Sequence, residues 1–128
     1  TEWIALVAGQ TPGHGFLPKA QLDEPQDRIQ IDKLRNVGDN SAIRITASTS
    51  DDHHIRQRLR AWHHPVVGDT EFGDRRANHL ARRHDYLDRL ALHCLRASSE
   101  GDVREASVPG DFLALLRLPR HVLEEENR

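Results

Sequence analysis

The spacing of apolar residues changes in the middle of the chain, and this change limits the folds that the chain can adopt. In residues 29–34 and 42–49, apolar and polar residues alternate, which is the two-residue period of a β-strand with one buried face. After residue 50, Ile55, Leu59 and Trp62 follow at spacings of four and three, the period of an amphipathic helix. The sequence therefore predicts strands followed by a helix that shares their core.

The residues before this helix predict an antiparallel sheet. Residues 3–8 form a continuous apolar run that ends at Gly9, which is the pattern of a buried strand. Turn residues at 38–40 join the two alternating segments into a hairpin. Residues 10–27 contain five Pro and Gly residues and predict a loop, with a brief strand at 15–17.

The second half of the chain adds helices and further strands. Asp51 or Asp52 is placed to cap the predicted helix, and Pro65 ends it. The other predicted elements are a short strand at 66–67, a loop and short helix within 74–88, a strand at 90–95, a turn at 100–102 and a helix at 112–118 capped by Asp111. The predicted fold class is α+β, a mixed, largely antiparallel sheet with two or three helices.

The domain organisation is simple. The chain has 128 residues, without a repeat or a composition break, which suits one domain with a modest core. We expect a single, partial domain over residues 1–120 and a frayed acidic tail over residues 121–128. Because the chain begins at Thr1 and contains no Met, we expect a processed or trimmed piece, or one whose true start is missing.

The composition of the chain indicates the cellular compartment in which we expect it. No apolar run approaches the roughly 20 residues that cross a bilayer, and the start does not resemble a signal peptide, so we expect no membrane association. The single cysteine, Cys94, excludes an internal disulfide, which favours a reducing compartment. We therefore expect a cytoplasmic protein.

The distribution of charge is more informative than its sum. The net charge is −2, but residues 53–96 carry 9 basic against 5 acidic residues, and every basic one is Arg. Arg binds phosphate through a planar fork of donors, so this excess favours an anionic partner. A solvated helical surface explains the same pattern equally well, and charge alone does not separate the two interpretations.

Four groups of residues occur in an order that is typical of one enzyme family. They form a helix-opening motif, a turn motif, a strand motif and a closing segment: His53, Ile55, Arg56 and Leu59; His64, Pro65, Val67, Gly68 and Asp69; Arg89, Leu90, Leu92 and His93; and Pro109, Asp111 and Phe112. In these positions the chain resembles the C-terminal half of the catalytic domain of RluA-type pseudouridine synthases. Gly68-Asp69-Thr70, Gly73-Asp74 and Asn78 are most similar to the tRNA-modifying branch without an S4 domain.

This resemblance implies a function and a set of site residues. It implies an isomerase that converts uridine to pseudouridine in tRNA or rRNA, with RNA as partner and no cofactor. The residues that we predict to bind RNA are Trp3, His53, Arg56, Arg58 and Arg60.

The chain departs from the family at positions that the chemistry uses. The family's catalytic aspartate lies in a His-Arg-Leu-Asp motif, which this sequence lacks, so we assign no catalytic residue and expect the chain alone to be inactive. Trp3 stands where the family has an active-site tyrosine, and His54 where it has Gln. Asp51 is an altered active-site position, because the resemblance implies an arginine there that pairs with the catalytic aspartate.

Three hypotheses follow from these departures. The chain is the C-terminal part of a pseudouridine synthase, a non-catalytic RNA-binding domain derived from that family, or a structural or protein-interaction domain. A missing N-terminal half would leave a strand edge exposed, which predicts a homodimer or association with that half.

The nine His residues suggest a metal site, but their spacing does not support one. His53-His54 and His63-His64 are adjacent pairs, whose side chains diverge on a helix, and no His-x-x-x-His pattern occurs there. We therefore predict no metal ligands.

Overall fold

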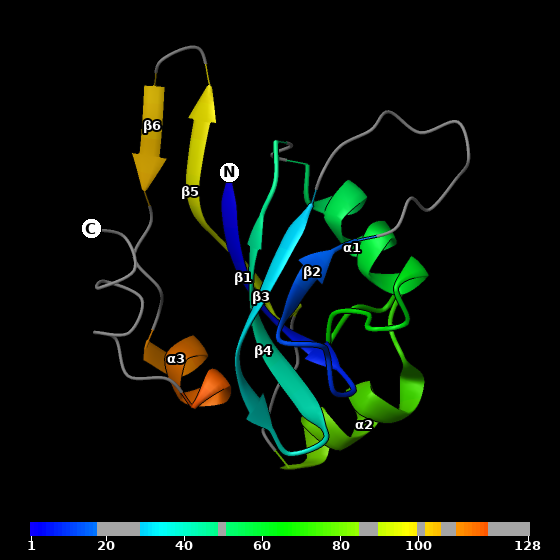
Figure 1. Cartoon of the computed structure of the whole chain (residues 1–128). Helices are drawn as coiled ribbons and strands as arrows, with labels where there is room; N and C mark the ends of the chain where they lie inside the picture. Colours follow the sequence, from blue (N-terminus) through cyan, green and yellow to red (C-terminus); the bar gives the residue numbers. More distant parts are fainter. Residues whose placement is uncertain (18–28, 49–50, 85–89, 100–101, 106–109, 118–128) are drawn as a thin grey trace.

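The chain folds into an antiparallel sheet with helices on both sides (Figure 1). The computed structural model describes residues 1–17, 29–48, 51–84, 90–99, 102–105 and 110–117. In chain order the elements are β1 (Glu2–Ala8), β2 (His14–Phe16), β3 (Gln30–Val37), β4 (Asn40–Thr46), α1 (Asp52–Ala61), α2 (Arg75–His84), β5 (Leu92–Ser99), β6 (Asp102–Glu105) and α3 (Gly110–Leu116).

The order of the strands in the sheet is β2-β3-β4-β1-β5-β6, and neighbouring strands are antiparallel. β3 and β4 form a hairpin through Gly38, whose φ of 59° suits a residue without a Cβ. The first strand in sequence, β1, therefore lies between β4 and β5 and pairs with both. This central place explains why its residues are apolar without alternation.

Both faces of the central strands are buried. Ile4 and Leu6 on one face of β1, and Ala5 and Val7 on the other, are all at most 1% exposed. Helices α1 and α2 lie on one side of the sheet and α3 lies on the other (Figure 1). On that second side, the rings of His93 and Phe112 are 6.0 Å apart.

The predicted fold class is confirmed, and so are the hairpin, the main helix and the predicted strands other than the one at residues 66–67. The prediction of a strand at residues 66–67 is wrong, because Val66 forms only an isolated β-bridge with Val7. Strand β6 was not predicted, and α3 begins at Gly110, which places Asp111 inside its first turn. Residues 100 and 101 of the predicted turn, Arg89 and Pro109 of the motifs, and the predicted tail lie outside the described residues.

Candidate functional site

The N-terminus of α1 is fixed by Asp51. Its side chain accepts a hydrogen bond from the backbone N–H of His53 at 3.0 Å, while its own backbone is extended. The first N–H groups of a helix have no partner within the helix, and an aspartate at the N-cap supplies one. Asp51 therefore has a local structural role as the N-cap of α1.

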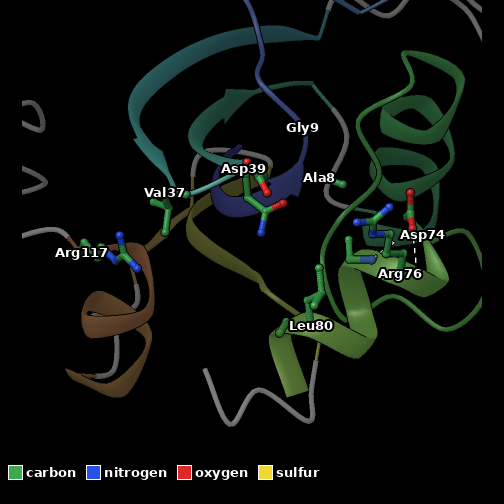
Figure 2. A pocket seen from close by; sticks show the side chains of 12 residues that line it. Ala8, Gly9, Val37, Asp39, Asp74, Arg76, Leu80 and Arg117 are labelled. Carbon is green, nitrogen blue, oxygen red and sulfur yellow. Dashed lines mark hydrogen bonds between the residues drawn. The ribbon is translucent and has the colours of Figure 1, made fainter. Parts of the chain in front are cut away.

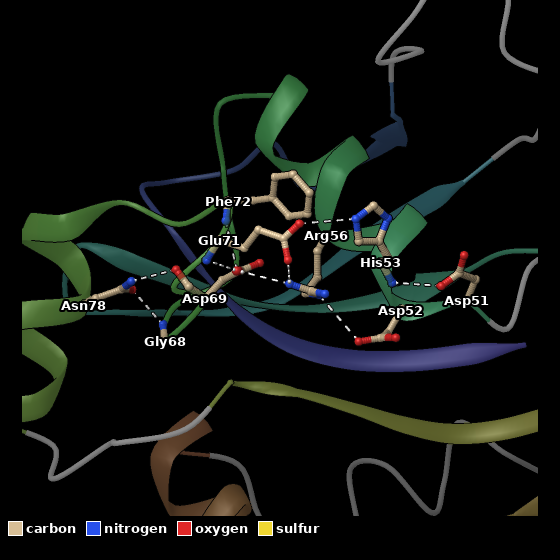
Figure 3. A network of polar contacts seen from close by, with 9 residues as sticks. All are labelled: Asp51, Asp52, His53, Arg56, Gly68, Asp69, Glu71, Phe72 and Asn78. Atoms are coloured by element: carbon tan, nitrogen blue, oxygen red, sulfur yellow. Dashed lines mark hydrogen bonds and ion pairs between the residues drawn. The ribbon is translucent and has the colours of Figure 1, made fainter.

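Arg56 is the centre of a polar network that joins α1 to the loop after Val67 (Figure 3). Its Nη1 lies 3.2 Å from Asp69 Oδ1 and 3.8 Å from Glu71 Oε2, and its Nε lies 3.4 Å from Asp52 Oδ2. The Arg56 side chain is 15% exposed, so most of its charge is presented to these carboxylates rather than to solvent.

Asp69 is the buried member of this network. Its side chain is 1% exposed, and Oδ1 also accepts hydrogen bonds from the backbone N–H groups of Glu71 and Phe72, at 2.9 and 3.0 Å. These bonds close a turn that ends at Gly73. A Cβ at Gly73 would lie 2.0 Å from the Asp69 backbone oxygen, so the turn requires glycine there.

Asn78 holds the other side of the same turn. Its Oδ1 accepts from Gly68 N–H at 2.7 Å, and its Nδ2 donates to the Asp69 backbone oxygen at 2.9 Å (Figure 3). Asn78 lies on α2, so the turn is fixed from α1 by Arg56 and from α2 by Asn78.

The turn motif is also attached to β1. His64 Nδ1 lies 2.8 Å from the backbone oxygen of Ala8, and because a carbonyl only accepts, this nitrogen carries the proton. The next residue, Gly9, has a φ of 82°, and a Cβ there would lie 3.1 Å from the same nitrogen. His64 is therefore a structural group that ties the turn motif to β1.

The C-terminus of α1 has the hydrogen bonds of a Schellman motif. The backbone N–H of His63 donates to Arg60 O at 2.9 Å, and that of His64 donates to Leu59 O at 3.1 Å. His63 takes the left-handed conformation of this motif, with a φ of 68°. Glycine is the usual residue at that position, because it lacks a Cβ.

The structure separates the residues predicted to bind RNA into two groups. His53 and Arg60 are exposed on α1, and Arg56 is largely covered by its carboxylate partners. Arg58 is 1% exposed and donates to the backbone oxygen of Leu17 at 3.0 Å, and Trp3 is 6% exposed within the core. Position 58 lies three residues after Ile55 and four before Trp62, so the helical period alone places it on the buried face.

Phe72 also lies at this site, although no motif in the sequence predicts it there. Its ring lies 5.5 Å from the Arg56 guanidinium carbon and 5.2 Å from the His53 ring, in an edge arrangement (Figure 3). Glu71 Oε1 lies 3.3 Å from His53 Nε2. The signal was the position of Phe72 directly before Gly73, within the loop that follows the turn motif.

Three further properties can be examined in the described residues: metal binding, membrane spanning and the reactivity of the cysteine thiol. Among them, no group of three or more His, Cys, Asp or Glu side chains is placed to hold a metal ion. No helix in the described part of the chain is long and apolar enough to span a membrane. Burial raises the pKa of the Cys94 thiol above its ordinary value, which disfavours a reactive thiolate.

Comparisons with known proteins agree with the resemblance to pseudouridine synthases. The chain is 30% identical over 127 residues to an uncharacterized RNA pseudouridine synthase of Chloroflexus aurantiacus, covering 88% of this chain and 40% of that protein. It is 34% identical over 120 residues to tRNA pseudouridine synthase C of Pasteurella multocida, covering 73% of this chain and 49% of that protein. No family model matches the chain.

A solved structure shares the fold. The human RNA pseudouridylate synthase domain containing 1 superimposes with a TM-score of 0.61 at 20% identity, over 90% of this chain and 56% of that one. The chain is thus homologous to pseudouridine synthases of the RluA type over most of its length. It spans about half the length of these relatives.

Proposed function

We propose that this chain is the C-terminal part of an RNA pseudouridine synthase domain that acts on tRNA or rRNA, and that it does not isomerise uridine by itself. The observation that carries the proposal is the Arg56–Asp69 pair, which joins the helix motif to the turn motif at 3.2 Å. The name of the Pasteurella multocida relative, a tRNA pseudouridine synthase, supports tRNA as the substrate class.

The reaction of the family requires a catalytic aspartate, and this sequence lacks the motif that carries it. Isomerisation breaks the bond between N1 of uracil and C1′ of the ribose and forms a bond from C5 to C1′. C5 releases its proton to solvent, and N1 takes one up. The uridine must leave its stack so that the enzyme can reach these atoms. The family resemblance implies a catalytic aspartate in a His-Arg-Leu-Asp segment, which is absent from this sequence.

In this proposal the chain contributes a rigid frame and part of the RNA surface. Asp69 and Asn78 hold the turn against α1 and α2. His53 and Arg60 are the exposed members of the predicted RNA-binding set, and Arg56 orients the loop that presents Phe72. Arg58 and Trp3 support this surface from the core.

Asp51 sets the electrostatics at the altered position. A carboxylate here would repel an aspartate supplied by an upstream half. An arginine in its place would remove that repulsion.

The test is release of tritium from C5 of uridine in an unmodified tRNA transcript. We expect no release by the chain alone, and release by it would overturn the proposed inactivity. The N-terminal half of the Pasteurella multocida relative is then added, with the parent chain or with Asp51→Arg. The proposal expects turnover in these mixtures, and more turnover with Asp51→Arg. A mixture that binds tRNA as a complex but releases no tritium would overturn the synthase assignment.

The second candidate is a non-catalytic RNA-binding domain of the same family. The observation in its favour is the use of Asp51 as the cap of α1, because a structural role there does not require a catalytic partner. Binding of tRNA without turnover in the complemented mixture would support this candidate. Absence of tRNA binding at low salt would instead favour a structural or protein-interaction domain.

Association with another polypeptide is part of the proposal. β2 forms one edge of the sheet, and Phe16 on it is 58% exposed. Exposed strand edges are usually covered, so we expect either a homodimer or binding of the N-terminal half. Sedimentation of the chain alone and with that half separates the two. The proposed compartment is the cytoplasm, where the single thiol of Cys94 would remain reduced.

A further inference from the structure

Helix α2 carries the densest group of free positive charges in the described part of the chain. Its four arginines, Arg75, Arg76, Arg82 and Arg83, are all exposed. The helix contains no acidic residue, and no ion pair joins these arginines to any described carboxylate. This cationic helix is not one of the elements to which the motif residues assign RNA contacts.

Helix α1 differs in this respect. Arg56 shares its charge with three carboxylates, and Arg58 is buried. Arg60 is therefore the exposed arginine that remains on α1. Most of the exposed arginines in the middle third of the sequence therefore lie on α2.

The arginines of α2 are held on a rigid element. Asp74 Oδ1 accepts hydrogen bonds from the backbone N–H groups of Arg76 and Ala77, at 2.8 and 3.1 Å, and so begins the helix. Ala81 is 2% exposed and packs in the core, and Asn78 binds the turn at Gly68. These contacts use the inner face of the helix and leave its outer face to the arginines.

The spacing of these side chains forms a continuous stripe. Arg75, His79 and Arg82 are four and three residues apart, so they lie on one face of the helix, and Arg83 adjoins them. Residues 75–83 extend about 12 Å along the helix axis. Such a row of Arg forks is suited to consecutive phosphates of a nucleic-acid strand.

A hollow beside α2 adds to this surface. Arg76 lines a hollow of about 410 Å³ together with Arg117, with Leu80 and Asp39 also in its wall (Figure 2). The two arginines come from opposite sides of the hollow, and Asp39 lies between them (Figure 2). The nearby carboxylates Asp39 and Asp74 balance the charge within the hollow, so the stripe outside it is the stronger anion-binding surface.

We propose that the exposed arginine face of α2 binds the sugar-phosphate backbone of RNA outside the reacting nucleotide. This inference rests on the proposed function, because it assumes that the substrate is RNA. In Figure 3, Asn78 of α2 and Asp51 lie at opposite ends of the polar network, with Arg56 between them. The contacts at α2 position the RNA without reading its sequence.

The test compares two double variants of equal charge for binding an unmodified tRNA transcript over a series of salt concentrations. Arg75→Gln/Arg82→Gln removes two charges from α2 and keeps good helix formers. Lys33→Gln/Arg35→Gln removes two charges from β3 as the matched control. Circular dichroism and melting temperature establish that both variants fold as the parent does.

We expect the α2 variant to lower tRNA affinity at low salt at least tenfold. The slope of log affinity against log salt should fall by about 1.4 to 1.8, because each phosphate contact contributes roughly 0.7 to 0.9. The β3 control should keep the affinity and slope of the parent.

The other outcomes distinguish the inference from the function on which it rests. A parent that binds tRNA, with an α2 variant that binds equally well, would overturn the inference and leave the proposed function intact. An equal loss in the β3 control would attribute binding to net charge and would also overturn it. A parent that binds no tRNA at low salt would overturn the RNA assignment as well, and equal binding of polyglutamate would point to an acidic polypeptide instead.

Discussion

Arg56 and Asp69 form an ion pair at 3.2 Å between Nη1 and Oδ1, across 13 positions of the chain. Arg56 belongs to the helix motif and Asp69 to the turn motif. The ion pair therefore gives a structural reason why the two motifs occur together. Asp69 is buried and also holds two backbone N–H groups of its turn. The position of the loop with Glu71 and Phe72 therefore depends on this carboxylate.

Replacement of Asp69 by Asn should destabilise the protein by about 2–3 kcal/mol, because it leaves the partly buried Arg56 without its innermost counter-charge. The amide keeps an acceptor for the two backbone N–H groups. Chemical denaturation measures the loss. Glu71→Gln is the matched control, because the Glu71 side chain is 55% exposed, and it should cost less than about 1 kcal/mol. Equal losses in the two variants would contradict the assigned role of Asp69.

Replacement of His63 by Gly should stabilise the protein by up to about 1 kcal/mol, because His63 occupies a left-handed conformation that disfavours a side chain with a Cβ. Glycine also gains entropy in the unfolded chain, which reduces the benefit. The midpoint of denaturation is the measurement. His63→Ala keeps the Cβ and should show no such gain, and a gain as large in His63→Ala would exclude relief of backbone strain as the cause.

Replacement of Asp51 by Ala should cost about 1 kcal/mol of folding free energy, because α1 loses its N-cap. Asp51→Ser removes the charge but keeps a capping oxygen, and it should stay close to the parent. Thermal unfolding followed by circular dichroism compares the two. If serine destabilises as much as alanine, the charge of Asp51 rather than its hydrogen bond to His53 stabilises the helix.

Replacement of Gly73 by Ala should destabilise the protein by roughly 1–3 kcal/mol, because the new Cβ would press on the backbone oxygen of Asp69 and force the turn to move. Gly13→Ala is a suitable control, since a Cβ there meets no atom within 4 Å. Denaturation midpoints report the effect. An unchanged Gly73→Ala protein would mean that the turn accommodates a side chain without loss.

At about one pH unit below the ordinary thiol pKa, Cys94 should react with iodoacetamide more slowly in the folded protein than in the denatured protein. Burial raises the pKa of Cys94, so its thiolate fraction is small in the folded protein. Folding stabilises the neutral thiol, so this contribution is fully present below the ordinary thiol pKa and is lost as the pH rises through the raised value. Mass spectrometry follows alkylation at this single cysteine. Equal rates in folded and denatured protein would contradict the prediction.

Local patterns in the sequence were enough to predict most elements of the fold. The alternation in residues 42–49 predicted β4, and the apolar run of residues 3–8 predicted β1. Both patterns can be read from the sequence because successive side chains of a strand point to opposite faces of the sheet. The helical stripe of α1 and its capping aspartate were equally local. The polar segment after Gly73 was predicted only as a loop with a short helix, because its few apolar residues give a weak period.

The position of each strand and side chain relative to distant segments was decided only by tertiary structure. The sequence determined which segments form strands and helices and which residues match the family motifs, because these depend on neighbours along the chain. Tertiary packing decided that β1 lies between β4 and β5, that Asp69 meets Arg56, and that the arginines of α2 remain exposed. These relationships join residues far apart in sequence, where burial and charge pairing depend on the whole fold rather than on any local pattern.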